Sequence, residues 1–98
     1  LNTDVDGIIV EGTGLGNTTA KLADGIVKAV EMGVPVVVTT RCPAGGVAPV
    51  YGYRGGNKML VDNGAINAGD LSTQKARIKL RLALEAVERP MAVEQYFP

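Results

Sequence analysis

Residues 7–17 read GIIVEGTGLGN, an apolar run that leads into glycines at positions 12, 14 and 16 and then into Asn17. A continuous apolar run closed by glycine favours a strand that is buried on both faces. The segment VPVVVTT, residues 34–40, has the same character. Between them, residues 18–32 show helical periodicity, with an apolar face made of Leu22, Ala23, Ile26, Val27 and Val30. Strand, helix and strand in this order predict a parallel pair joined by a right-handed crossover.

The ends of this first helix carry capping residues. Asn17 or Thr18 is placed to cap its start, because short polar side chains accept hydrogen bonds from the first free backbone amides. Gly33 is placed to end it, since glycine readily adopts the left-handed conformation that closes helices. The segment after the second strand, residues 41–56, is rich in glycine and proline and has no periodicity. A loop of that length in a compact domain is usually functional or disordered.

The second half of the chain predicts further helices around a short strand. Residues 57–63 favour a short helix closed by Gly64, and residues 65–69, AINAG, a weak strand. Residues 72–87 favour a long helix capped by Ser72 and blocked by Pro90, and residues 92–97 one last helical turn. The apolar stripe of the long helix is Ala76, Leu80, Ala83, Leu84 and Val87. We therefore expect a small open parallel α/β sheet with flanking helices, which lacks its first strand–helix unit.

Composition limits the classes of function. Ten basic and ten acidic residues cancel, so no net charge attracts nucleic acid or an anionic membrane. No apolar run approaches the roughly 20 residues that span a bilayer. Cys42 is the only cysteine and histidine is absent, which excludes an internal disulfide, a cysteine-rich zinc site and catalysis by a Ser-His-Asp or Cys-His constellation within this chain.

The glycine loop leaves two interpretations open. A dinucleotide fingerprint needs glycine at the sixth position of G-x-G-x-x-G, where this chain carries Asn17, and no acidic residue ends the next strand. The glycines then serve either as a tight strand-to-helix turn or as a backbone that approaches a ligand. A carboxamide both donates and accepts hydrogen bonds, which suits a small zwitterionic ligand.

The order of the motifs EGTGLGN, VVVTTRCPAGG and AGDLSTQKARIKLRLAL resembles the C-terminal domain of the L-asparaginases. The related asparaginase-like subunit of archaeal glutamyl-tRNA amidotransferase contains the same domain. The resemblance covers essentially the whole chain and rests most specifically on Gly16 with Asn17, on the Arg41-x-Pro43-x-Gly45 turn, and on LSTQKARIKL. It implies that residues 1–98 are this domain. Because the chain enters a strand within a few residues of Leu1, we expect an incomplete domain from a longer protein.

The resemblance also implies a division of labour. In the family, two catalytic threonines, a lysine and an aspartate lie in a larger N-terminal domain, and their motifs are absent from these 98 residues. Two protomers form an intimate dimer, and residues of the partner's C-terminal domain complete each active site. Asn17, beside Gly16, matches the asparagine that reaches toward the α-amino end of the substrate. The resemblance thus implies an asparagine-hydrolysing homodimer or homotetramer that needs neither cofactor nor metal, and an isolated chain that is inactive.

One departure concerns the loop after the Arg-x-Pro turn. Periplasmic members carry a glutamate there that contacts the substrate's ammonium group, whereas GGVAPVYGYRGG contains no carboxylate. Tyr51 and Tyr53 are the candidates to approach the substrate instead. The run VYGYRGG is closer to cytoplasmic-type, Gram-positive or archaeal-like members, so we expect a cytoplasmic protein, with export left open. Cys42 lies near the position of a cysteine beside an allosteric asparagine site in some of them, which makes it a regulatory candidate. Arg41 is expected to bind loop carbonyls.

Two alternatives to an asparaginase stay open at this stage. The amidotransferase subunit uses the same chemistry but delivers ammonia to a charged-tRNA partner. A non-catalytic α/β module that binds a nucleotide or an amino acid is the alternative from a different class.

Overall fold

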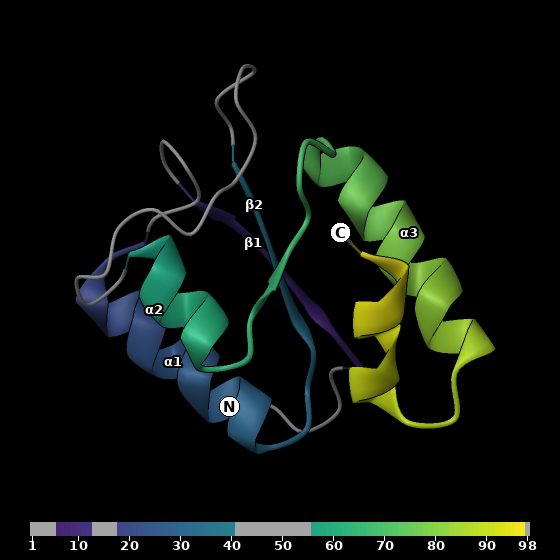
Figure 1. The fold of residues 1–98 in the computed structure, drawn as a ribbon, viewed down its shortest axis with the longest axis horizontal. Helices are drawn as coiled ribbons and strands as arrows, with labels where there is room; N and C mark the ends of the chain where they lie inside the picture. Colours follow the sequence, from purple (N-terminus) through teal and green to yellow (C-terminus); the bar gives the residue numbers. More distant parts are fainter. Residues whose placement is uncertain (1–5, 13–17, 41–55, 98) are drawn as a thin grey trace.

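A computed structural model of the chain describes residues 6–12, 18–40 and 56–97. Its elements in chain order are β1 (Ile8–Gly12), α1 (Ala20–Glu31), β2 (Val36–Thr40), α2 (Asn57–Asp62), β3 (Ile66–Asn67), α3 (Thr73–Ala86) and the 3₁₀ helix η1 (Pro90–Tyr96) (Figure 1). Every predicted strand and helix in the described ranges is present, and the final turn is of the 3₁₀ type.

The three strands form one parallel sheet with β2 in the centre. Five residues of β1 pair in register with β2, from Ile8 opposite Val36 to Gly12 opposite Thr40. β3 pairs over two residues only, Val37 with Ile66 and Val38 with Asn67. This arrangement confirms the predicted parallel α/β sheet. Because all three strands run the same way, their carboxyl ends meet at one edge of the sheet.

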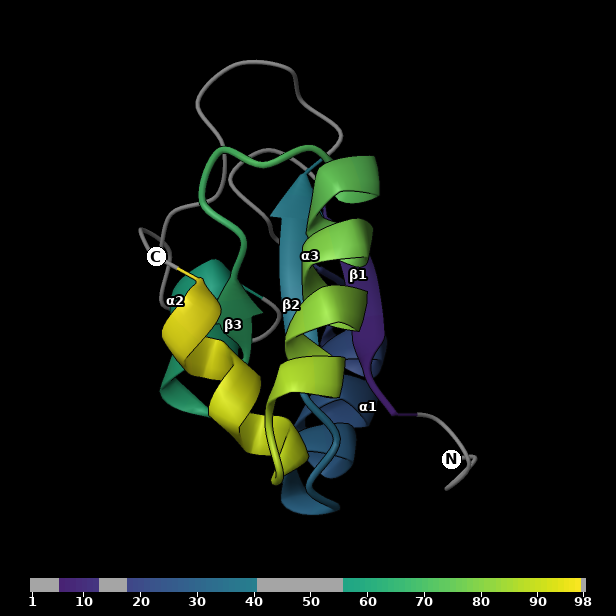
Figure 2. The same cartoon turned by 90° about the vertical axis from the view of Figure 1, so that its right-hand side faces the viewer.

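Helices cover both faces of the sheet, as the side view shows (Figure 2). On one face, α1 and α2 pack against alternate strand residues, in a cluster that contains Val10, Ala23, Ile26, Ala29, Val34, Val36, Val38, Leu60 and Ala65. On the other face, α3 and η1 pack in a second cluster of Val37, Ile66, Ala68, Ala76, Leu80, Ala83, Val93 and Phe97. The domain therefore has three layers and two apolar cores, separated by the sheet.

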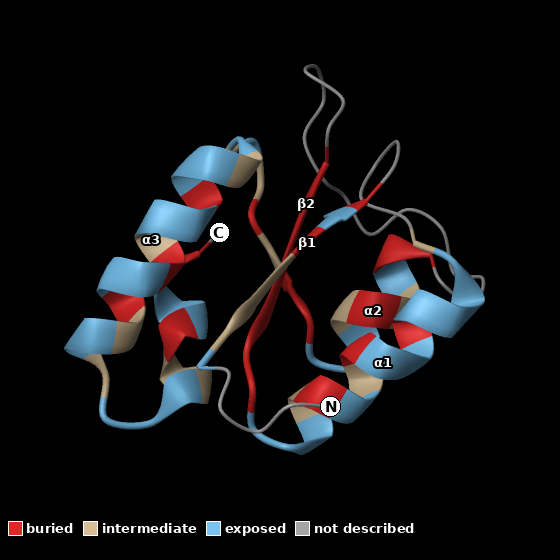
Figure 3. Ribbon diagram, turned by 180° about the vertical axis from the view of Figure 1, so that it is seen from behind, coloured by how far each residue is buried: buried red, intermediate tan, exposed pale blue. Residues whose placement is uncertain are grey.

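Strand β2 explains why its sequence is apolar at consecutive positions rather than alternating. Val36 and Val38 contribute to the α1 core, and Val37 contributes to the α3 core. All five residues of β2 are buried, as the continuous red ribbon shows (Figure 3). A strand that lies between two helical layers has no solvent face, so both sets of alternating side chains must be apolar or hydrogen-bonded.

The first helix differs from the prediction at its start. Thr19, rather than Asn17 or Thr18, is the N-cap, and its hydroxyl accepts a hydrogen bond from the Leu22 amide at 3.2 Å. Leu22 itself is 45% exposed, although it was expected on the apolar face. The buried face is set by Ala23, Ile26 and Ala29. Consecutive helical residues are about 100° apart, which turns Leu22 out of that face.

The long helix α3 follows its prediction closely. The Ser72 hydroxyl caps it by accepting a hydrogen bond from the Lys75 amide at 3.2 Å. Ala76, Leu80 and Ala83 are buried against the sheet, while Leu84 and Val87 pack at the margin of that core. Within the described residues, no helix is long and apolar enough to cross a membrane.

Two glycines end helices in the left-handed conformation, but only one of them is crowded. Gly33 has φ +81° with open space around a would-be Cβ. Gly64 has φ +100°, and a Cβ there would lie 2.7 Å from Cγ1 of Val30. We predict that Gly33→Ala costs about 1 kcal/mol of unfolding free energy from backbone strain alone. Gly64→Ala should cost about 2–3 kcal/mol, because overpacking adds to the strain.

Urea denaturation of the two variants beside the parent protein measures this difference. Gly25→Ala is the reference for a helical glycine with no neighbour within 4 Å, and it should leave stability unchanged or raise it by about 0.5–1 kcal/mol. Equal losses at Gly33 and Gly64 would contradict the close packing of α2's end against α1.

Candidate functional site

Polar side chains gather where β1 and β2 end and α3 begins. Glu11 lies near the end of β1, Thr39 near the end of β2, and Thr73 is the first residue of α3. Figure 1 shows the end of β2 and the start of α3 at the same, upper edge of the sheet. In open parallel sheets, ligands bind outside the carboxyl ends of the strands. We call this region, defined by Glu11, Thr39 and Thr73, the carboxyl edge.

The three side chains are joined by hydrogen bonds. The Thr73 hydroxyl donates to Oε2 of Glu11 at 2.5 Å, and Oγ1 of Thr39 lies 2.9 Å from Oγ1 of Thr73. Since a threonine hydroxyl has a single proton, Thr73 spends its own on Glu11 and must accept from Thr39. The hydrogen bonds therefore run in one direction, from Thr39 through Thr73 to the Glu11 carboxylate.

The register of the sheet explains why these residues meet. Glu11 is paired with Thr39 across β1 and β2, two residues beyond the pair Ile9 and Val37. Ile9 and Val37 both pack in the α3 core, and side chains two apart along a strand share a face. Glu11 and Thr39 thus point to the α3 side, where the helix start supplies Thr73. A carboxylate is also favoured there, because a helix N-terminus carries partial positive charge.

A second polar contact links α2 to β3. Asn57, the first residue of α2, is fully buried, and Asn67 ends β3. Their carboxamides exchange two hydrogen bonds, from Nδ2 of Asn57 to Oδ1 of Asn67 at 2.9 Å and from Nδ2 of Asn67 to Oδ1 of Asn57 at 2.8 Å. Because Asn57 follows residues 41–56 in the chain, this amide pair fixes the point at which that segment rejoins the core.

The residues that sequence reasoning singled out lie outside the described part of the chain. Gly16 and Asn17 belong to residues 13–17, and Cys42, Tyr51 and Tyr53 belong to residues 41–55, as does Arg41. Their assigned roles therefore stay predictions. Both segments are nevertheless attached to the carboxyl edge, because residues 13–17 directly follow β1 and residues 41–55 directly follow β2.

Sequence reasoning missed Glu11, Thr39, Thr73 and the amide pair. One signal was present: the apolar run VPVVV ends in two threonines, and polar residues that end a buried strand often face a site. The pairing of Thr39 with Thr73 and of Thr73 with Glu11 joins positions 34 and 62 residues apart. Contacts over such separations depend on the tertiary fold and carry no local sequence signature.

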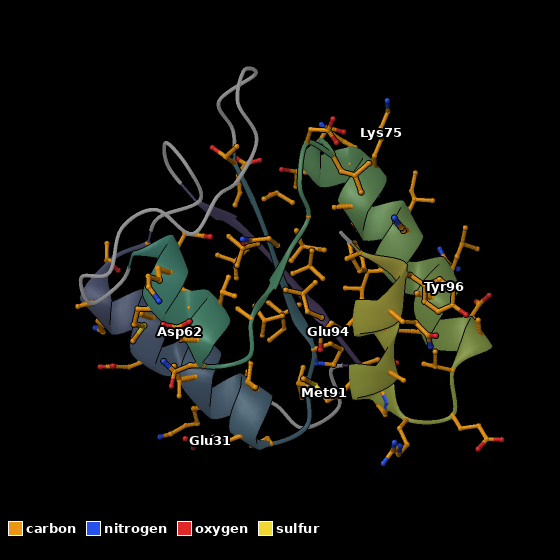
Figure 4. The ribbon with its side chains drawn as sticks, in the orientation of Figure 1. Glu31, Asp62, Lys75, Met91, Glu94 and Tyr96 are labelled. Carbon is orange, nitrogen blue, oxygen red and sulfur yellow. The ribbon has the colours of Figure 1, made fainter. Side chains whose placement is uncertain are left out.

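An apolar groove of about 500 Å³ runs along the outer side of α3. Ile78 and Leu82 in its wall are 58% and 61% exposed. Figure 4 marks Lys75 at its α3 end and Tyr96 from η1 beside the helix. Its lining residues, Leu71, Lys75, Ile78, Lys79, Leu82, Ala83, Ala86 and Tyr96, include no carboxylate to hold a substrate ammonium group. Exposed apolar surface of this kind is typical of protein contacts.

The described residues include no group of three histidine, cysteine, aspartate or glutamate side chains that could hold a metal ion. Every buried side-chain nitrogen or oxygen among them has a hydrogen-bond partner. The polar groups at the carboxyl edge are thus arranged to orient one another. This geometry suits a surface that holds neighbouring segments in place.

Three parallel strands between two helical layers, with polar residues at the carboxyl edge, define the class as a small open α/β domain of the ligand-binding type. Comparison with known families makes the assignment specific. The model of the glutaminase/asparaginase C-terminal domain matches residues 1–97, and the chain belongs to this family. The resemblance to the C-terminal domain of the L-asparaginases is thereby confirmed.

Individual relatives agree with the family. A probable L-asparaginase of Deinococcus radiodurans is 42% identical over 79 residues, which cover 81% of this chain and 24% of the relative. A probable periplasmic L-asparaginase of Haemophilus influenzae is 36% identical over 97 residues, covering 99% and 26%. One subunit of the glutamyl-tRNA(Gln) amidotransferase of Aeropyrum pernix is 37% identical over 97 residues, covering 99% and 22%.

A solved structure shares the fold. The crystal structure of a probable cytoplasmic L-asparaginase from Campylobacter jejuni superposes with a TM-score of 0.75 at 35% identity. The match covers 94% of this chain and 27% of that protein. The chain therefore spans about a quarter of the length of the relatives it matches.

The amide pair provides a stability test with a matched control. Asn57→Asp keeps the side-chain shape but buries a carboxylate, one oxygen of which would face Oδ1 of Asn67. We predict a loss of about 3 kcal/mol in unfolding free energy, since a buried charge without a donor is costly. Asn63→Asp makes the same chemical change on an exposed side chain that donates to the Met59 carbonyl at 2.8 Å, and it should cost less than about 1 kcal/mol.

Urea denaturation at neutral pH distinguishes the two sites. The difference should shrink as the pH falls toward 4, because protonation of the new carboxyl removes its charge and restores a donor. A similar cost at both positions would contradict the role of the amide pair.

Proposed function

We propose that the protein containing this chain is an L-asparaginase, which hydrolyses L-asparagine to L-aspartate and ammonia, and that this chain is its C-terminal domain. The observation that carries the proposal is the family match over residues 1–97, together with the three-layer parallel fold that it shares with an L-asparaginase structure. The Deinococcus and Haemophilus relatives bear the same name.

In this scheme the chemistry takes place in the other domain. A threonine nucleophile attacks the side-chain carbonyl of asparagine, ammonia leaves from an acyl-enzyme, and water hydrolyses the ester. Backbone or side-chain donors stabilise the negative oxygen of both tetrahedral intermediates. The sequence of this chain contains neither the threonine-rich motifs of that site nor a histidine, so by itself it is inactive. The reaction requires no metal and no cofactor.

The contribution of this domain is substrate recognition at a neighbouring active site. Asn17, with Gly16 beside it, orients the α-amino end of the substrate through its carboxamide. Its attachment supports this role, because five residues of chain reach at most about 18 Å from Gly12, which lies at the carboxyl edge. Tyr51 and Tyr53 are further substrate-binding candidates, and Cys42, two residues after the buried Thr40, is a regulatory candidate.

The partners follow from the same proposal. They are the protein's own N-terminal domain and further copies of the protein, in a homodimer or homotetramer. The apolar groove beside α3 supports a protein contact, since it is open and almost without polar atoms. We assign the protein to the cytoplasm, which agrees with the Campylobacter structure, whereas the Haemophilus relative is named periplasmic.

A second candidate function has a specific observation in its favour. The amidotransferase subunit of Aeropyrum matches almost the whole chain at an identity close to that of the asparaginase relatives. In that case the protein would release ammonia for a glutamyl-tRNA partner rather than into solution. Ammonia production that depends on a partner protein and charged tRNA would identify it. A module that binds NADP and has no amidase activity is the third possibility.

The first test is ammonia release by the full-length protein. Purified protein should hydrolyse asparagine without added metal or partner, and residues 1–98 alone should not. Calorimetric titration with asparagine and with NADP separates the enzyme from a nucleotide-binding module. Saturable NADP binding without amidase activity would contradict the proposal, as would full activity of the isolated chain.

The second test concerns Asn17. In the full-length enzyme, Asn17→Ala should lower kcat/KM for asparagine by about tenfold or more, because a hydrogen bond to the charged substrate is lost. Asn63→Ala removes the same kind of side chain from the exposed end of α2 and should leave kcat/KM unchanged. Equal kinetics for Asn17→Ala and the parent enzyme would refute the assigned role.

A further inference from the structure

The hydrogen-bonded carboxyl edge joins three elements that are distant in sequence. Glu11 comes from β1, Thr39 from β2 and Thr73 from α3, and their contacts are 2.5 and 2.9 Å long. The segment that contains Asn17 leaves from β1, and residues 41–55 leave from β2. The three side chains therefore link the departure points of both segments to the start of the helix that follows β3.

The direction of the hydrogen bonds fixes the carboxylate. Thr39 donates to Thr73 and Thr73 donates to Glu11, so both hydroxyl protons are committed. Charge-assisted hydrogen bonds of this kind are about twice as strong as neutral ones. The carbonyl of Val10 lies 3.5 Å from the Thr39 hydroxyl, too far to compete with the 2.9 Å contact for that proton. Glu11 is exposed, yet one of its oxygens is held at a defined place.

Stability alone does not account for these residue types. Thr39 is fully buried in a strand whose three preceding residues are valines, and valine has the same shape as threonine without a polar group to desolvate. An apolar contact between position 39 and α3 would hold the layers together equally well. What a directed hydrogen-bond chain adds is a fixed orientation between the elements it joins.

We propose that Glu11, Thr39 and Thr73 are positioning residues for substrate binding. They hold the end of β1 in a fixed orientation relative to β2 and to the start of α3, and this fixes the base of the segment that recognises the substrate. None of the three touches the substrate in this scheme. The inference rests on the proposed asparaginase function and adds to it three residues that act on substrate affinity from the supporting side of the carboxyl edge.

The experiment uses the full-length enzyme with Thr73→Val and Thr39→Val, which remove one hydroxyl each and keep the β-branched shape. We expect KM for asparagine to rise about fivefold to tenfold in each, which is the effect of losing roughly one charge-assisted hydrogen bond, with kcat within about twofold of the parent. Thr73→Ser keeps the hydroxyl and should restore KM to within about twofold. Glu11→Ala, at an exposed side chain, should raise KM in the same way.

The matched control is Ser72→Ala. It removes the hydroxyl that caps the same helix end, whose contact with the Lys75 amide is 3.2 Å, but it leaves Glu11, Thr39 and Thr73 in place. A purely structural role lowers the fraction of folded enzyme, which reduces the apparent kcat and leaves KM unchanged. We expect Ser72→Ala to lower the unfolding midpoint in urea without moving KM.

The outcomes separate the inference from the function on which it rests. A rise of KM in the valine variants and in Glu11→Ala, absent in Ser72→Ala and reversed in Thr73→Ser, supports it. An active parent enzyme whose variants lose only apparent kcat, in proportion to folded protein, overturns the positioning role alone. A parent enzyme without asparaginase activity overturns the proposed function and the positioning role together.

Discussion

The burial of β2 on both faces is the constraint on which the rest of the structure depends. Its three valines are fully shielded from solvent, and each such side chain is worth about 1.5–3 kcal/mol when removed from water. That burial requires a helical layer on either side and a neighbouring strand along each edge. β1, α1 and α3 take the places that β2 needs, and the polar end of the strand, Thr39, is accommodated only because Thr73 offers a hydrogen bond.

The local signals in the sequence are sufficient to predict the fold. The two apolar runs, the amphipathic helices, and the stops at Gly33, Gly64 and Pro90 all act over a few residues, and the structure contains the elements they indicate. The exact cap of α1 and the exposure of Leu22 were wrong in the prediction, because both depend on which helical face the sheet happens to contact. Local patterns leave that rotation undetermined within one residue.

The site was predictable only in part. The resemblance carried by EGTGLGN and its companion motifs indicates the family, which the family match confirms, while the roles of Asn17, Tyr51 and Tyr53 stay predictions because those residues lie outside the described ranges. The hydrogen bonds at the carboxyl edge could not be foreseen, since they join residues up to 62 positions apart. The account that results has a central claim: this domain presents its carboxyl edge to the active site of a neighbouring protomer.

Mixed dimers test that claim most directly. Two inactive or impaired full-length variants are coexpressed, one with Asn17→Ala and the other without the threonine nucleophile that the resemblance places in the N-terminal domain. If Asn17 serves the neighbouring site, each mixed dimer contains one site with both groups intact, and kcat/KM per intact site equals that of the parent enzyme. If Asn17 acts within its own protomer, every site lacks one group, and a mixture no more active than the Asn17→Ala protein would contradict the account.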